Sequence, residues 1–349
     1  MRKWILGVGL VGVAILLMAP ATTLYFETGN GRRCTGCHEM QSQYDRWADS
    51  SHRGIACAKC HGSALTTDVS FHRNNAERAY SHLRGDLPER IGFPNSAAEA
   101  MTAECQGCHR QEYAGWQAGP HSATYARIFL DKKYNAGNMP MDDCLRCHGL
   151  QFEGGIGDLV APVDRQGPWR LRDEALAAKP SMPCVTCHEM HREGRPMNKA
   201  SEDGSVAGPS QETTRPSLAL FDRRTQEYIP VAELPLPAMW DGSRAVKMSN
   251  DQRQALCYQC HAPLATAQVG SGDDRTGMGV HEGISCLACH AQHGQTTKAS
   301  CATCHPKMSN CGLDVEKMDT SFVSTKSKHN VHWVKCADCH TKGVPKKKI

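Results

Sequence analysis

Aromatic residues are scarce in this sequence. Phe, Tyr and Trp make up 6% of 349 residues, although hydrophobic residues reach an ordinary 40%. Aromatic rings normally supply much of the core of a domain, so something else is expected to fill much of this interior. The chain also lacks any sustained alternation of apolar and polar residues, the pattern typical of a half-buried strand. A large sheet is therefore not expected.

Cysteine, by contrast, is abundant. Eighteen of the 19 cysteines form nine CxxC pairs, and each pair is followed directly by His. The pairs are Cys34/Cys37, Cys57/Cys60, Cys105/Cys108, Cys144/Cys147, Cys184/Cys187, Cys257/Cys260, Cys286/Cys289, Cys301/Cys304 and Cys336/Cys339. The histidines are His38, His61, His109, His148, His188, His261, His290, His305 and His340. We number these motifs one to nine in chain order.

CxxCH is the attachment signature of haem c. Its two thiols form thioethers with the porphyrin, and its imidazole is the proximal ligand of the iron. Zinc ribbons and redox-active CxxC pairs are the competing interpretations. Neither chemistry requires His after every second Cys, so the sequence predicts nine covalent haems. These cofactors would also form much of the core that aromatic side chains do not supply. The expected fold is mainly α with extensive coil, organised around a chain of stacked haems, with short helices around the haem motifs.

The formal net charge of +4 does not indicate a nucleic-acid-binding protein. Each haem adds two propionates, so the loaded protein is expected to be acidic and the basic residues to compensate these groups. The lysine run at 346–348 is interpreted as a solvated tail in preference to a binding patch.

An apolar stretch of 23 residues without charge, from Trp4 to Phe26, follows Arg2 and Lys3. Its length suits one transmembrane helix with the N-terminus inside. A cleaved signal peptide is the alternative, because Ala19-Pro20-Ala21 resembles a cleavage site. Both interpretations place the haem-bearing part on the periplasmic or extracytoplasmic side, and the first predicts a single-pass protein of the cytoplasmic membrane.

The motif spacing predicts four regions. Residues 1–26 form the anchor or signal, residues 27–195 a domain with five haems, residues 196–250 a connector, and residues 251–349 a domain with four haems. The connector is rich in Pro and Gly and is expected to be mostly irregular. Its apolar pieces, 218–221 and 234–240, are expected to pack onto the haem-bearing body. A helix is expected over 248–258, with Ser249 or Asn250 as its cap.

The histidine count suggests the second axial ligands. Nine of the 18 histidines lie outside the motifs, one for each haem. These spare histidines are His52, His72, His82, His121, His191, His281, His293, His329 and His332. Each could instead be an ordinary surface or core residue, but the equal numbers favour bis-His, low-spin haems that carry electrons.

Two motifs continue as CxxCHxxH, which places His191 and His293 three residues after a motif histidine. On a helix such residues project from the same face, so they cannot bind one iron from opposite sides. Each is therefore expected to reach a neighbouring haem. A repeat, H-x-G-I-x-C-x-x-C-H, begins at both His52 and His281, and His332 lies in a looser copy. Such local crosslinks would turn the chain into an electron wire.

The first 61 residues resemble the NapC/NirT/NrfH family of membrane-anchored cytochromes. The matching features are the apolar N-terminus, the run from Cys34 to Met40, and His52 shortly before the second motif. The resemblance implies electron transfer from membrane quinol to periplasmic partners. It also implies Met40 as a possible axial ligand of the first haem. That family normally carries four or five haems, fewer than this chain predicts.

From Cys105 onward the chain resembles octahaem and hydroxylamine oxidoreductase-like cytochromes, through the third motif followed by Tyr113, Trp116 and His121. Catalytic members of such groups often have an open haem or a CxxCK motif. The sequence contains no CxxCK, because Lys59 lies inside a motif. This argues against an active site of the nitrite-reductase type.

These patterns predict a membrane-anchored nonahaem protein that passes electrons from menaquinol or ubiquinol to a periplasmic or extracellular redox protein in respiration. One alternative is an oxidoreductase with one open haem, acting on a small nitrogen or sulfur compound. Another is a relay subunit of a larger respiratory complex, fed by a membrane quinol-oxidising subunit. The odd cysteine, Cys311, is expected to be a free buried thiol, with thioether, redox or crosslinking roles as alternatives.

Overall fold

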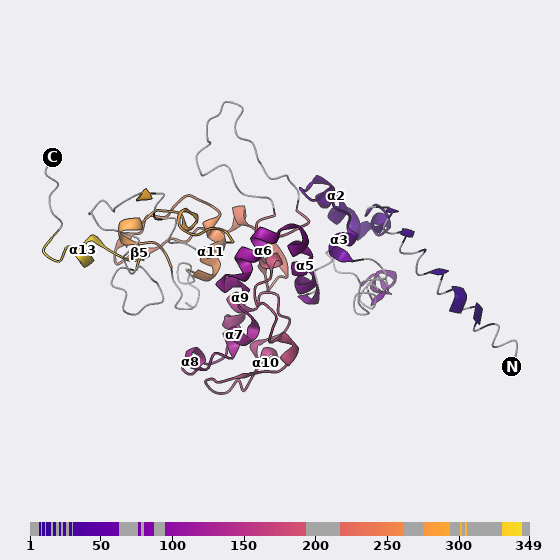
Figure 1. The fold of residues 1–349 in the computed structure, drawn as a ribbon, viewed down its shortest axis with the longest axis horizontal. Helices are drawn as coiled ribbons and strands as arrows, with labels where there is room; N and C mark the ends of the chain where they lie inside the picture. The colour runs from indigo at the N-terminus through magenta and orange to yellow at the C-terminus, as the bar shows by residue number, and fades with distance from the viewer. Residues whose placement is uncertain are drawn as a thin grey trace, which may run out of the picture.

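A computed structural model describes residues 31–62, 80–86, 95–192, 217–261, 275–293, 301, 304–305 and 330–343, together with residues 76 and 77 and scattered residues of 7–29. The molecule is elongated, and the N-terminal stretch and helix α13 lie toward opposite ends of its long axis (Figure 1). The elements that carry motifs follow this axis from α3 through α5 and α11 to α13. One lobe, residues 120–181 with α7, α8 and α10, projects to the side.

Most of the described chain is short helix and coil, as predicted. The α-helices are α2 (Gln41–Asp49), α3 (Ala58–His61), α5 (Asn95–Cys108), α6 (Arg110–Gln117), α7 (Tyr125–Phe129), α8 (Lys132–Asn135), α9 (Leu145–His148), α10 (Ile156–Leu159), α11 (Gln254–His261) and α13 (Cys336–Cys339). The 3₁₀ helices are η1 (Cys34–Gly36), η2 (His38–Met40), η3 (Pro120–Ser122), η4 (Asp142–Cys144), η5 (Glu174–Leu176), η6 (Cys184–Thr186), η7 (Val231–Glu233), η8 (Gly279–His281) and η9 (Cys286–Ala288). Helix α5, with 14 residues, is the longest helix of the described residues.

Three two-stranded antiparallel sheets interrupt the coil. They pair β1 (Val160–Ala161) with β2 (Arg170–Leu171), β3 (Ala219–Asp222) with β4 (Glu227–Pro230), and β5 (Trp240–Asp241) with β6 (Arg244–Ala245). Strands of two to four residues are too short to show an alternating pattern in the sequence. Two of these hairpins lie in the region expected to be a mostly irregular connector. Apart from these strands and η7 (Val231–Glu233), the described residues 217–250 are turns and coil.

The hairpins form because the connector has local turn chemistry and buried partners. Asp222 accepts a hydrogen bond from the backbone NH of Arg224 at 2.9 Å, which tightens the turn between β3 and β4. Ala219 and Phe221 point inward and are 0% and 2% exposed. The backbone NH of Ala219 also donates to the carbonyl of Cys187 at 3.1 Å. The piece 218–221 thus packs onto the body, as the sequence analysis expected.

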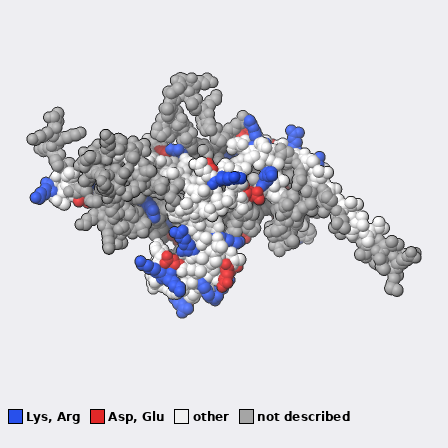
Figure 2. Space-filling model, in the orientation of Figure 1, with Lys and Arg blue, Asp and Glu red and all other residues white. Residues whose placement is uncertain are grey.

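The lobe has a conventional hydrophobic core. Its buried residues are Tyr125, Phe129, Leu145, Ile156, Leu159, Val160, Trp169 and Leu171. Two helices of the lobe, α7 and α8, begin at side-chain caps: Thr124 accepts from the NH of Arg127, and Asp131 from the NH groups of Lys133 and Tyr134. Such caps satisfy amide groups that a short helix leaves without partners. On the lobe surface, Lys and Arg side chains lie beside Asp and Glu (Figure 2).

Within the described residues, no helix is long and apolar enough to cross a membrane. The span predicted over Trp4 to Phe26 lies mostly outside those residues. The described side chains of this stretch include Leu10, Leu17 and Leu24, which are 71%, 65% and 64% exposed. The guanidinium of Arg33 lies 4.1 Å from the ring centroid of Tyr25 and donates to the Tyr25 carbonyl. This contact ties the end of the apolar stretch to the first motif.

Candidate haem-binding sites

Short helical turns carry the attachment motifs. Motifs one to seven and nine place at least one cysteine on, or directly beside, η1, α3, α5, α9, η6, α11, η9 and α13, respectively. On a helical turn, residues three apart lie on one side, so both thiols of a CxxC pair can reach one porphyrin edge. In motif eight, Cys301, Cys304 and His305 lie within the described residues.

The second cysteine lies outside the helical turn in motifs one, five and seven. In these motifs the expected short helix is a three-residue 3₁₀ turn that begins at the first cysteine, and Cys37, Cys187 and Cys289 each come directly after it. Cys37 even has an extended backbone, with φ −96° and ψ 122°.

A single hydrogen bond still keeps each of these pairs together. The backbone NH groups of Cys37, Cys187 and Cys289 donate to the carbonyl of the first cysteine of their pair, each at 3.2 Å. The side chain of Cys37 is exposed and that of Cys289 is half-buried. Both can therefore still reach a porphyrin edge, and their assignment as thioether sites stays a prediction.

Six motif histidines each face one spare histidine. The pairs and their ring-centroid separations are His38 with His82 (5.4 Å), His61 with His191 (5.7 Å), His109 with His52 (6.1 Å), His188 with His293 (6.0 Å), His261 with His121 (6.1 Å) and His290 with His332 (6.2 Å). Every one of these pairs joins a motif histidine to a spare one. None of the six pairs joins two motif histidines or two spare histidines.

The ring separations fit a metal ion between two imidazoles. An imidazole nitrogen binds a metal at about 2 Å, so two rings on opposite sides of one ion have centroids about 6 Å apart. The observed range of 5.4 to 6.2 Å lies at this value. Two attachment cysteines and two facing imidazoles are the full donor set that a bis-His haem c requires, so the residues present fit the cofactor.

Four spare histidines are oriented through Nδ1. This atom lies 2.8 Å from Oε1 of Glu39 in His82 and 3.1 Å from Oε1 of Gln43 in His191. In His281 and His332 it lies 3.3 Å from the Val331 carbonyl and 3.1 Å from Oδ1 of Asn330. An acceptor at Nδ1 favours the tautomer whose Nε2 is free to bind a metal. The sequence analysis had not assigned Gln43, Val331 or Asn330 to any site, because isolated amides and carbonyls carry no motif.

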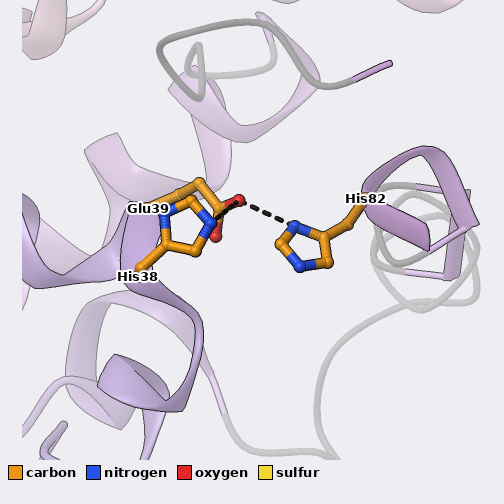
Figure 3. A group of neighbouring side chains, drawn as sticks. All are labelled: His38, Glu39 and His82. Carbon is orange, nitrogen blue, oxygen red and sulfur yellow. Dashed lines mark hydrogen bonds and ion pairs between the residues drawn. The ribbon is translucent and has the colours of Figure 1, made fainter. Parts of the chain in front are cut away.

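Glu39 lies between the two histidines of the first pair (Figure 3). Its Oε1 contacts Nδ1 of His82 at 2.8 Å and Nε2 of His38 at 3.1 Å. Iron binding by His38 would require Glu39 to leave Nε2 of that ring while keeping its contact with His82. His82 therefore competes with Met40, half-buried at the end of η2, for the second axial position of the first motif.

Burial keeps at least one candidate ligand neutral. Desolvation, together with the charges of His61, Arg46 and His52, lowers the pKa of His191 to about 4. A neutral imidazole is the form that binds metal ions. His191 therefore needs no deprotonation near neutral pH before it can act as a ligand.

The remaining histidines balance in number. Three motif histidines, His148, His305 and His340, are outside the six ring pairs, and so are three spare ones, His72, His281 and His329. His72, His329 and Cys311 lie outside the described residues. Tyr113 and Trp116 lie together with ring centroids 5.4 Å apart, and Trp116 donates to the Met182 carbonyl at 3.2 Å. They brace α6 against the segment that leads into motif five.

Comparisons with known proteins find c-type cytochromes. Residues 1–151 match the NapC/NirT cytochrome c family, N-terminal region, and residues 238–291 match cytochrome c554 and c-prime. The chain is 24% identical over 161 residues to the cytochrome c-type protein NrfH of Wolinella succinogenes, a match that covers 45% of this chain and 87% of that protein. No solved structure matches the chain.

The matches cover the first four motifs and part of the later ones. They do not show the resemblance to octahaem and hydroxylamine oxidoreductase-like cytochromes, which stays a prediction. Together with the paired histidines, they support a multihaem c-type cytochrome of the NapC/NirT type that takes part in electron transfer.

Proposed function

We propose that the chain carries nine haems c and conducts electrons along them, from a quinol at the membrane to a periplasmic or extracellular redox protein. The observation that carries this proposal is the set of six ring pairs, each joining a motif histidine to a spare one at 5.4 to 6.2 Å. When bound, each haem supplies one iron that takes up and releases a single electron. The domain boundaries at residues 195 and 250 remain part of this proposal.

The histidines decide between conduction and catalysis. Two imidazoles on one iron occupy both axial positions and leave none for a substrate, so the paired sites suit conduction. Equal numbers of motif and spare histidines extend this assignment to His72, His281 and His329 at the three other haems. An enzyme would instead keep one axial position open. Carbon monoxide binding to the reduced protein separates these functions, since only an open haem takes it up at once.

Haem content and ligation can be measured on one sample. The denatured protein should have the mass of the chain plus nine haems, and the magnetic spectrum of the oxidised protein should be dominated by low-spin iron. Seven haems or fewer would contradict the count. A dominant high-spin signal would contradict bis-His ligation, whatever the count proves to be.

The quinol part of the proposal rests on position and resemblance. Cys34 follows the apolar stretch by only eight residues, so the first motif cannot lie far from the end of that stretch. Quinols dissolve in the bilayer and deliver their electrons near its surface. The NapC/NirT resemblance implies the same donor, and Glu39 and the segment 41–47 are the nearest groups that could accept protons.

A truncation tests this donor. Full-length protein in liposomes should be reduced by a menaquinol analogue faster than protein lacking residues 1–26. A soluble chemical reductant, which should reduce both forms equally, is the control. Equal rates with the quinol would mean that the N-terminus only tethers a relay fed by another protein.

A further inference from the structure

The third and fifth motifs lie against each other, although the fourth separates them in sequence. Helix α5, which ends in motif three, packs against η6 of motif five. Ala98 and Met101 of α5 bury against Val185 of η6. Cys105 of motif three packs against the same cluster. The two attachment sites are therefore neighbours.

The lobe explains how the chain passes from motif three to motif five. Its two ends are joined by backbone hydrogen bonds from Tyr125 NH to the Lys179 carbonyl and from Ser181 NH to the Ala123 carbonyl, both at 3.0 Å. Motif four lies within this excursion, and Leu145 of α9 is fully buried in the lobe core. These hydrogen bonds join the two ends of the lobe, so the chain that leaves the lobe after motif four enters motif five beside motif three.

Motif four instead contacts motif six. Helix α9, which carries Cys147, packs against α11, which carries Cys257 and Cys260. The same helix α11 packs against η9 of motif seven, where the backbone NH of Cys286 donates to Oε1 of Gln254 at 3.4 Å. Helix α11 thus contacts both motif four and motif seven.

Motif five completes the junction. Strand β3 contacts η6 of motif five, and Leu218 and Leu220 pack in one cluster with Ala255 of α11, the helix of motif six. The ring pair of His188 and His293 also joins motif five to the segment that follows motif seven. Attachment sites three, five, six and seven thereby form one continuous row, and site four adjoins the row at six.

We propose that the haem of motif four is a side branch of the wire, joined to it at motif six, and that electrons pass along motifs three, five, six and seven without using it. This inference rests on the proposed function. An electron that enters the branch oxidises one ferrous iron at site six and reduces one ferric iron at site four. The branch ends in the lobe, where Met139 and Met141 beside motif four are 42% and 53% exposed. It gives the protein a second point of electron exchange, away from both ends of the long axis.

Iron positions in the haem-loaded, full-length protein test the order directly. Electron cryomicroscopy should show the iron of motif six as the nearest neighbour of the iron of motif four. It should also show the iron of motif three closer to that of motif five than to that of motif four. A motif-four iron lying between those of motifs three and five would overturn the branch.

Magnetic coupling gives an independent readout. The double variant Cys144→Ser/Cys147→Ser should lose one haem by mass and change the coupled spectrum of a single partner. The matched variant Cys184→Ser/Cys187→Ser should also lose one haem but change the spectra of at least two partners. Equal changes in the two variants would contradict the branch. If the double variant does not fold, the iron positions in the wild-type protein decide the order.

The same samples keep the two proposals apart. Seven haems or fewer by mass, or a dominant high-spin signal in the wild type, would contradict the proposed count or ligation. The order of the haems that are present would still be read from the iron positions.

Discussion

The lobe and the segment that carries the first two motifs, residues 31–62, are built differently. The lobe buries eight hydrophobic side chains in one cluster, whereas α2, α3, η1 and η2 bury no residue. His38 illustrates the contrast, because its side chain is 82% exposed. Where the chain has its own apolar side chains, they form the core. Where it lacks them, we expect the porphyrins to take that place.

Removal of the cofactor should have the largest effect on this comparison. In protein produced without haem attachment, we expect residues 31–62 to lose protection from hydrogen exchange, because little else buries them. The lobe should keep protected amides in α7 and β1, since its core is made of side chains. Hydrogen exchange followed by mass spectrometry measures both regions in one experiment. Equal loss of protection in the two regions would refute the contrast.

The second largest effect is expected from replacing a proposed axial ligand of a haem in the segment 31–62. His191→Met replaces the imidazole that faces His61 with a thioether, which stabilises ferrous iron and raises a haem potential. We expect one haem to shift upward by on the order of 100 mV. Gln43→Leu, which removes only the acceptor at Nδ1 of His191, should give a smaller shift. Redox titration monitored optically measures both, and an unchanged titration of His191→Met would remove His191 from the ligands.

Shortening a side chain in the lobe core should lower the free energy of unfolding without altering any haem redox potential. Val160 is 0% exposed and Val163, in the same lobe, is 44% exposed. Val160→Ala should lower the free energy of unfolding by roughly 2 kcal/mol, through lost burial and a residual cavity. Val163→Ala should change it by less than about 0.5 kcal/mol. Guanidinium unfolding gives both values, and equal losses would mean that the lobe is not held by this core.

The smallest effect on stability is expected from a change at Asp251, which joins the segments before motifs six and seven by accepting a hydrogen bond from Ser285. Burial raises the pKa of Asp251, but hydrogen bonds from Arg253 and Ser285 outweigh it and bring this pKa below its ordinary 3.8. A lowered carboxyl pKa adds stability above that ordinary value, and this stability is lost as the pH falls through the folded-state pKa. Because the site is partly solvated, we expect less than about 1 kcal/mol.

Asp251→Asn should therefore reduce stability at pH 7 and lose less than the wild type on acidification to pH 3. Asp164→Asn, at an exposed aspartate of the lobe, is the matched control. Unfolding curves at the two pH values measure the difference. A wild type and Asp251→Asn variant with parallel pH dependence would show that this carboxylate does not contribute.

Local patterns in the sequence were sufficient for the attachment motifs and the general class of fold. The CxxCH motif is contained within five residues, so its position needs no knowledge of the tertiary structure. The pairing of histidines could not be predicted in the same way. His121 and His261, for example, are 140 residues apart and meet only because η3 and the end of α11 lie in the same part of the molecule.

Two further local expectations differ from the structure for identifiable reasons. The CxxCHxxH segments were expected to be helical, but His188 pairs with Leu218 in a β-bridge. That bridge holds the segment extended, and His188 and His191 face different partner rings. The helix expected over 248–258 begins only at Gln254, because the Asp251 side chain accepts from the NH of Arg253 and forms a turn first.

Spare histidines that come from distant parts of the sequence also impose an order on the maturation of the haem sites. A chain that is synthesised and exported from its N-terminus presents early residues first. On the proposed ligation, a haem attached at Cys105 finds His52 already delivered, whereas one attached at Cys57 must wait for His191, 130 residues after His61. During that interval its iron would have one axial position open to small oxidants. Maturation of the second site would therefore be completed only after the fifth motif has crossed the membrane.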